Sequence, residues 1–180
     1  MSSEKLLLLS CCAPCSVGVI QDLHDRQVDF TVLFYNPNIR PETEYIRRRN
    51  ENARVCAELD VPFIELPYEP TVWEEATQGL ENEPEKGKRC DVCFLLRLRQ
   101  AARYAREHGF TQFSSVLGIS RFKDFDQVCR AAQTAATEEQ IPYDATNWRK
   151  NGGLEKAERL AKEKGLYRQT YCGCHPLVKP

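Results

Sequence analysis

The chain of 180 residues lacks any apolar run long enough to cross a bilayer. Its first residues, MSSEKLLLLSCC, also lack the basic start and long hydrophobic centre of a signal peptide. These absences predict a cytoplasmic protein with no membrane partner. An excess of positive charge is missing too, because 25 Lys and Arg residues face 26 Asp and Glu residues. Any contact with nucleic acid must therefore come from local basic patches rather than from a general positive field.

Internal repeats and low-complexity segments are absent as well. Hydrophobic residues make up 42% of the chain and charged residues 28%, which excludes the disordered and membrane classes and fits a globular protein. The length is enough to bury one sizeable core. We therefore expect a single domain over residues 1–180.

Cysteine is what the sequence has in excess. The chain contains nine cysteines, an odd number that cannot pair completely, and a reducing compartment favours metal or redox chemistry over disulfides. Seven of them form three tight groups: Cys11, Cys12 and Cys15; Cys90 and Cys93; Cys172 and Cys174. The other two, Cys56 and Cys129, lie among apolar residues of predicted helices, so we expect both to be core residues.

Strand patterns and helix patterns alternate along the chain. Strands are predicted over 5–9, 29–38, 61–68, 110–118 and 141–145, and helices over 16–26, 41–60, 90–109, 124–139 and 154–164. A polar excursion over 69–89 is predicted to contain one short helix at 73–77. The alternation predicts an α/β fold with a parallel sheet flanked by helices.

The predicted fold brings the three cysteine groups within reach of one another. The first group directly follows the strand over 5–9, and ligands of parallel α/β folds collect at the carboxyl ends of strands. The excursion and the C-terminal tail carry the other two groups and are expected to cover that site.

The number of clustered thiols indicates more than one metal ion. Cysteines in C-x-x-C and C-x-C pairs bind soft metals, but seven ligands exceed what one tetrahedral zinc uses. A four-cysteine iron–sulfur cluster leaves three thiols for a second metal or a redox pair. Because Cys11 and Cys12 are adjacent, we expect them to face different centres. His175 follows the last cysteine and is a further candidate ligand or proton donor.

Two other classes of protein compete with this interpretation. A strand followed by C-x-P-C at a helix start is typical of a thioredoxin-like oxidoreductase, with Cys12 and Cys15 as the redox pair. That alternative leaves the other clustered thiols unexplained. A tRNA-modifying ATP pyrophosphatase needs a Gly/Ser-rich phosphate loop after the first strand, and SCCAPCS contains no glycine.

Six segments stand out in order along nearly the whole chain: CCAPCS (11–16), FYNPNI (34–39), EYIRR (44–48), GLENEPEKGKRCDVCFLLRL (79–98), ISRFKD (119–124) and LYRQTYCGC (166–174). Together they resemble the QueH family of epoxyqueuosine reductases. Two positions depart from the family pattern. Leu9 stands where many members have His, and Asn147 stands where many have Asp.

The resemblance implies an enzyme of tRNA queuosine biosynthesis. The family reduces epoxyqueuosine to queuosine at the wobble position of tRNA without cobalamin, using a [4Fe-4S] cluster beside a second mononuclear metal ion, iron. It has a Rossmann-like fold of the adenine nucleotide α-hydrolase type. The implied partners are a tRNA that carries epoxyqueuosine in its anticodon and an unidentified electron donor.

On this basis we assign expected roles to individual residues. Cys90, Cys93, Cys11 and one of Cys172 or Cys174 are expected to hold the cluster, and Cys12 and Cys15 to face the second metal as catalytic residues. Candidate proton donors are Tyr45, Tyr171, Asp91 or a metal-bound water. Candidate contacts with tRNA phosphates are Arg47, Arg48, Arg49, Arg121, Lys123, Arg149, Lys150 and Arg168, with Trp148 and Tyr35 as stacking surfaces for bases.

Overall fold

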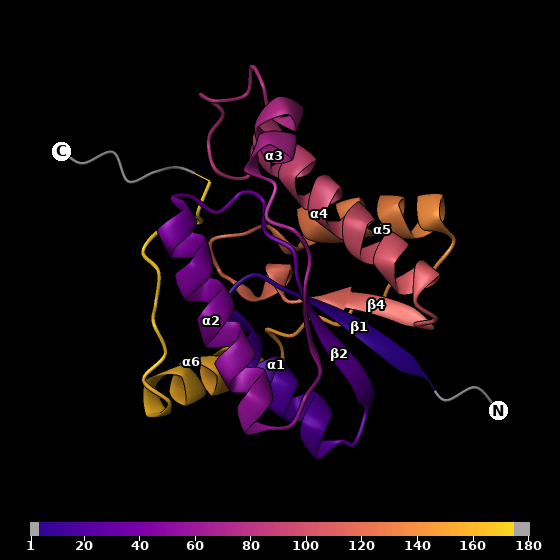
Figure 1. The fold of residues 1–180 in the computed structure, drawn as a ribbon, viewed down its shortest axis with the longest axis vertical. Helices are drawn as coiled ribbons and strands as arrows, with labels where there is room; N and C mark the ends of the chain where they lie inside the picture. The colour runs from indigo at the N-terminus through magenta and orange to yellow at the C-terminus, as the bar shows by residue number, and fades with distance from the viewer. Residues whose placement is uncertain (1–3, 175–180) are drawn as a thin grey trace.

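A four-stranded parallel sheet forms the centre of the protein (Figure 1). The computed structural model describes residues 4–174. The strands are β1 (Lys5–Ser10), β2 (Asp29–Phe34), β3 (Phe63–Glu65) and β4 (Gln112–Ser115), and their order in the sheet is β3-β2-β1-β4.

Strands β1 and β2 are buried on both faces, which explains their continuous apolar sequence. Leu7, Leu8 and Leu9 are fully buried, and Leu8 pairs in register with Val32 of β2. A strand covered on both faces by helices needs apolar residues at successive positions rather than an alternating pattern. The run KLLLL thus forms a buried parallel strand, as predicted, and this strand is one of the two inner strands of the sheet.

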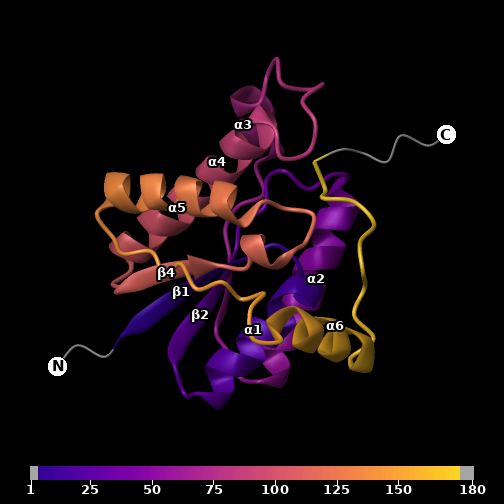
Figure 2. The ribbon, with the colours of Figure 1, turned by 180° about the vertical axis from the view of Figure 1, so that it is seen from behind.

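Helices cover both faces of the sheet (Figures 1 and 2). On one face, α1 (Ala13–Asp25) packs against α2 (Glu42–Glu58) and α6 (Gly153–Glu163). On the other face, α4 (Lys88–Glu107) packs against α5 (Phe125–Glu139), and the short α3 (Pro70–Ala76) contacts α4. A 3-10 turn, η1 (Leu117–Ile119), follows β4. The predicted α/β class and parallel sheet are confirmed.

The order in which the chain adds parallel strands to the sheet reverses at β1. From β1 the chain proceeds through α1 to β2 on one side, whereas β4, which pairs on the other side of β1, is reached later through α4. In open parallel sheets the crevice at such a reversal, beside the carboxyl ends of the strands, is where ligands bind. Cys11 and Cys12 follow β1 at this point.

Some predicted elements differ from the structure. The strand predicted over 141–145 is wrong, because the segment contributes a single bridge between Tyr143 and Phe113. Pro142 has no N–H to extend a ladder, although its carbonyl accepts a hydrogen bond from the Phe113 N–H. The strand predicted over 29–38 already ends at Phe34. Of the two isolated cysteines, Cys56 is fully buried as predicted, whereas Cys129 is only partly buried. No helix within 4–174 is long and apolar enough to cross a membrane.

Candidate active site

A cavity of about 540 Å³ lies at the carboxyl ends of β1 and β4. The loop after β1, the start of α4, the loop after η1 and the segment after α6 all contribute to its wall. Six of the seven clustered cysteines line this cavity: Cys11, Cys15, Cys90, Cys93, Cys172 and Cys174. The fold therefore brings the three sequence groups to one place.

The seventh clustered cysteine, Cys12, lies directly beside the cavity. The sulfur atoms of Cys11, Cys12 and Cys15 are all within 4.8 Å of one another, and those of Cys11 and Cys12 are 3.8 Å apart. Two sulfurs bound to one tetrahedral ion at about 2.3 Å lie about 3.8 Å apart. Adjacent positions in the sequence therefore do not require Cys11 and Cys12 to face different centres.

The backbone and a buried polar cluster fix this sulfur triad. Cys12 is the N-cap of α1, and Ser16 in the first turn donates hydrogen bonds to the Cys12 carbonyl (2.9 Å) and to Asn52 Oδ1 (3.1 Å). Ser10 Oγ donates to the same Asn52 oxygen at 2.6 Å. Asn52 belongs to α2 and thus ties the strand–helix junction to that neighbouring helix.

Cys90 and Cys93 lie in the first turns of α4, whose N-cap is Gly87. The partial positive charge at a helix N-terminus favours thiolate, and short spacing lets both sulfurs face the same cavity. Burial opposes this effect and raises the pKa of both thiols. A bound cation would restore the thiolate form, because it compensates for the lost hydration of the charge.

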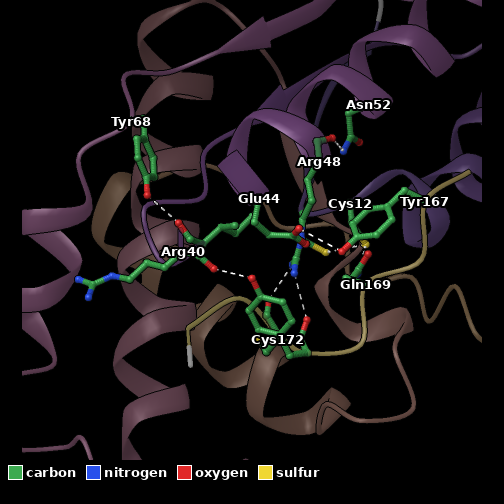
Figure 3. A network of polar contacts seen from close by, with 12 residues as sticks. Cys12, Arg40, Glu44, Arg48, Asn52, Tyr68, Tyr167, Gln169 and Cys172 are labelled. Carbon is green, nitrogen blue, oxygen red and sulfur yellow. Dashed lines mark hydrogen bonds and ion pairs between the residues drawn. The ribbon is translucent and has the colours of Figure 1, made fainter. Parts of the chain in front are cut away.

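Cys172 and Cys174 lie on a segment without helix or strand, residues 166–174, which we call the C-terminal strap. The strap runs beside α2 (Figure 2), and Arg48 of that helix holds it. The buried guanidinium donates to the carbonyl oxygens of Cys172 (2.8 Å) and Tyr171 (3.1 Å) and pairs with Glu44 at 2.7 Å (Figure 3).

Further polar contacts hold the strap along its length (Figure 3). The Tyr167 hydroxyl donates to Glu44 at 3.0 Å, and the Tyr171 hydroxyl donates to the Arg40 carbonyl at 2.5 Å. The Arg40 N–H donates back to the Gly173 carbonyl at 2.9 Å. The strap therefore closes over the cavity as a structured segment, as expected of the C-terminal tail.

Arg97 and Lys123 are two of the cationic side chains that line the cavity. Arg97 is 1% exposed and lies one helical turn after Cys93 on α4, and its guanidinium donates to Asn36 Oδ1. Lys123 comes from the loop after η1. Burial alone would lower the pKa of Lys123, but the nearby thiolates, Cys172 first, raise it.

Hydrogen bonds from other thiols and the charges of Lys123 and Arg97 lower the pKa of two thiols, Cys11 and Cys172. Hydrogen bonds from Cys12 and Cys15, followed by the charges of Lys123 and Arg97, hold the pKa of Cys11 well below its usual range. A hydrogen bond to Cys11 raises the pKa of Cys12 to about 12.

In the strap, the pKa of Cys172 is likewise lowered, by a hydrogen bond from Cys174 and then by Lys123. The surroundings therefore favour the thiolate form of one cysteine on each side of the cavity, Cys11 and Cys172.

The donor set fits a thiolate-ligated metal centre. Soft sulfur ligands, buried and converging from three segments, suit iron–sulfur clusters and other soft-metal ions. The cations beside them offset the negative charge that such thiolates bring into a buried site.

Comparison with known proteins identifies the family. The family model for the epoxyqueuosine reductase QueH matches residues 6–176. A QueH from Histophilus somni is 46% identical over 95% of this chain and 71% of its own length, and one from Acinetobacter baylyi is 47% identical over 96% and 80%. The chain belongs to the QueH family. A QueH from Thermotoga maritima is 34% identical over 94% of this chain and 88% of its own length.

Solved structures of two tRNA-modifying proteins share the QueH fold. The U34-tRNA thiolase NcsA from Methanococcus maripaludis, with its [4Fe-4S] cluster, has a TM-score of 0.60 at 13% identity, covering 98% of this chain and 63% of its own. A predicted subunit of a tRNA methyltransferase from Methanocaldococcus jannaschii has a TM-score of 0.59 at 11% identity, covering 90% and 88%. The likeness supports the Rossmann-like, adenine nucleotide α-hydrolase type of fold.

The structure separates the candidate proton donors of this QueH chain. Tyr171 lines the cavity, but its hydroxyl donates to a backbone carbonyl. Tyr45 packs against Tyr68, and its hydroxyl donates to Glu65 at 2.8 Å in a separate apolar cluster rather than in the cavity wall. Asp91 accepts a hydrogen bond from Gln127 at 2.7 Å. His175 lies outside the described residues.

Several residues predicted to contact tRNA are buried or already engaged within the protein. Arg48 is buried under the strap, and the partly buried Arg149 guanidinium donates to the carbonyls of Ile119, Ser120 and Lys123. Tyr35 is 5% exposed, and Trp148 packs against the core.

A better-placed aromatic residue is Phe122, which is 63% exposed and lines the cavity. Its exposed neighbour Arg121 lies over the ring.

Sequence reasoning also missed Arg97. Its position four residues after Cys93, on the same helical face, was the available signal.

The structure shows what surrounds the two residues that depart from the family pattern. Leu9 is fully buried in β1, and Asn147 Oδ1 accepts a hydrogen bond from the Arg149 N–H at 3.2 Å.

Proposed function

We propose that this protein reduces epoxyqueuosine to queuosine at the wobble position of tRNA, without cobalamin, and that it does so in the cytoplasm as a single domain. The observation that carries the proposal is the convergence of seven cysteines on one cavity in a member of the QueH family. Conversion of an epoxide to an alkene takes two electrons and two protons and releases the oxygen as water. A reductase of this kind therefore needs a centre that delivers electrons and a route for protons.

The seven sulfurs support two adjacent centres. We propose that Cys11, Cys12 and Cys15 hold the second metal ion, iron, because their sulfurs lie within 4.8 Å of one another. The other four clustered cysteines, which line the same cavity from α4 and the strap, would hold the [4Fe-4S] cluster. This division differs from the one expected from the sequence, which placed Cys11 with the cluster. Cys12 and Cys15 keep their proposed catalytic role at the second metal.

When bound, the cluster would supply electrons one at a time, and the second metal would polarise the epoxide oxygen as a Lewis acid. The side chains of this protein form the wall of the cavity around these centres. The strap and the excursion shield the cavity from solvent, with Trp73 and Arg89 of the excursion side in its wall. The Lys123 ammonium carries N–H donors into the cavity and could donate to the epoxide oxygen. Tyr171 remains a proposed proton donor that requires a change of hydrogen-bond partner, whereas Tyr45 would also have to move into the cavity.

Phe122 and its neighbours support the docking of tRNA. An enzyme that acts on a base must take that base out of the stack, and an exposed aromatic ring at the cavity is a surface on which a base stacks. Arg121 beside it is exposed and suits a phosphate contact. We propose that the anticodon loop enters at this rim. The electron donor has to approach the same centres.

The test is anaerobic purification followed by metal analysis and assay. We expect iron with acid-labile sulfide, one further metal ion, a broad visible band that bleaches on reduction, and conversion of epoxyqueuosine in tRNA. Cys12→Ser should lower the content of the further metal and abolish conversion, and Cys93→Ser should lower the sulfide content.

Cys129→Ser is the matched control, because this thiol lies on α5 outside the cavity wall. It should retain full metal content and activity. Zinc without sulfide in the wild type would instead favour a structural site and would overturn the proposal. Metal-free protein whose activity depends on Cys12 and Cys15 alone would favour the thioredoxin-like alternative.

A further inference from the structure

Three carboxamide side chains in the cavity wall have an oxygen atom without a hydrogen-bond partner among residues 4–174. They are Asn38 Oδ1, Gln127 Oε1 and Gln169 Oε1. Asn38 is 1% exposed and Gln127 is 4% exposed. A buried polar atom without a partner is destabilising, so three such atoms around one cavity indicate a ligand that supplies donors.

The orientation of two of these amides is set by their nitrogen atoms. Gln127 Nε2 donates to Asp91 Oδ1 (2.7 Å) and to the carbonyls of Lys86 (3.1 Å) and Gly87 (3.3 Å), which are all acceptors. Gln169 Nε2 donates to Cys12 Sγ at 2.8 Å. In both cases the amide nitrogen faces the protein, and the oxygen is left for another partner.

The sulfur atoms of a metal centre cannot supply that partner. Thiolate and sulfide sulfur atoms accept hydrogen bonds, as a carboxamide oxygen does, so two such groups facing each other leave both unsatisfied. Cationic side chains of the cavity wall such as Arg97 and Lys123 donate hydrogen bonds and suit the oxygen that leaves the epoxide rather than a hydroxyl proton. The unpaired carboxamide oxygens therefore need hydrogen-bond donors from a part of the substrate other than the epoxide.

We propose that Asn38, Gln127 and Gln169 form a hydroxyl-recognition subsite, in which their carboxamide oxygens accept hydrogen bonds from the hydroxyl groups of the substrate ring. The inference rests on the proposed function, since epoxyqueuosine carries hydroxyl groups on the cyclopentane ring beside the epoxide. Neutral acceptors suit neutral hydroxyl donors, because no charge has to be buried with them. The subsite would distinguish the modified nucleoside from an unmodified guanosine.

The experiment measures binding rather than turnover. The dissociation constants of anaerobically purified protein are compared for tRNA that carries queuosine and for the same tRNA with guanosine at that position. We expect the wild type to prefer queuosine tRNA. Asn38→Leu and Gln127→Met should each reduce this preference about threefold to tenfold, the value of one hydrogen bond, and leave the affinity for guanosine tRNA within about twofold.

Two further variants make the result specific. Asn38→Asp keeps an acceptor oxygen and should retain more of the preference than Asn38→Leu. Gln133→Met changes an exposed glutamine on the same helix as Gln127 and should behave as the wild type. The Gln127 side chain also links α5 to the start of α4. If Gln127→Met does not fold for this reason, the two Asn38 variants decide whether the subsite exists.

The outcomes separate the two proposals. A wild type that binds both tRNAs equally overturns the proposed function and the subsite together. A wild type with a clear preference that Asn38→Leu and Gln127→Met leave unchanged overturns the subsite alone, and the function stands.

Discussion

The first and the last cysteine groups reach the same cavity by opposite means. Cys11, Cys12 and Cys15 stand where β1 passes into α1, so the regular backbone of two packed elements fixes their positions. Cys172 and Cys174 stand on a strap without regular structure, held by side chains of α2 that are more than a hundred residues away in sequence.

The difference shows two kinds of order in one site. A strand–helix junction is a local structure that forms with the sheet, whereas the strap depends on a few long-range polar contacts. Loss of one such contact should therefore loosen the strap and leave the sheet and the triad in place. Substitutions in each region test that distinction.

Arg48→Met should have the largest effect. It removes one partner of a buried ion pair, in which the Arg48 and Glu44 side chains are 2% and 9% exposed, and leaves the carbonyls of Tyr171 and Cys172 without their donor. We expect the free energy of unfolding to fall by about 3–5 kcal/mol. Urea unfolding measures this change, and amide hydrogen exchange should rise in 166–174 before it rises in β1.

The control for this variant is Arg47→Met on the same helix. Arg47 is exposed and lies over the Tyr167 ring at 3.5 Å, a contact worth about 0.5–1 kcal/mol. An equal loss of stability in both variants would show that the strap does not depend on the buried pair.

Asn52→Ala should have an intermediate effect and act on the other region. It leaves the buried hydroxyls of Ser10 and Ser16 without their shared acceptor and removes the hydrogen bond from the Asn52 amide nitrogen to the Arg48 carbonyl. We expect a loss of about 2 kcal/mol, with increased amide exchange in the first turn of α1 rather than in the strap. Asn50→Ala, an exposed position on α2, is the control. Increased exchange confined to the strap would contradict the assignment.

Gly173→Ala should have the smallest effect. Gly173 has φ of +116°, and a Cβ there would lie 3.1 Å from Ile39 Cγ1 and 3.2 Å from Arg48 Nη1. Backbone strain and crowding together should cost about 1 kcal/mol, the lower end of the range for a strained residue, expressed as local opening of the strap. Gly79→Ala separates the two causes, because Gly79 has φ of +82° with no atom within 4 Å of a Cβ. If both variants open their segments equally, crowding at Gly173 contributes nothing.

The sequence predicted the sheet better than the site. KLLLL and DFTVLF are buried on both faces, so their apolar runs correctly indicated central parallel strands. The prediction of a strand over 141–145 was wrong. The single bridge that this segment makes to Phe113 depends on the neighbouring strand rather than on the local sequence pattern.

At the site, spacing along the chain predicted which cysteines form groups, but not which side chains support them. Arg48 lies in a helix of mostly polar and charged sequence, so the sequence pattern predicts an exposed residue. Its burial is created by the strap, which arrives from a distant part of the chain. Asn38 and Gln127 likewise become wall residues of one cavity only after the sheet has brought their segments together.

The position of the strap also sets an order of events during synthesis. A ribosome releases a chain from its N-terminal end, and domains fold as their segments emerge. The four strands and helices α1 to α5 precede Cys172 and Cys174 in the chain, so the sheet and the first two cysteine groups are exposed to the cell before the site can close. A nascent chain would thus present an open, partly built thiol site, and closure by the strap becomes a late step of its folding.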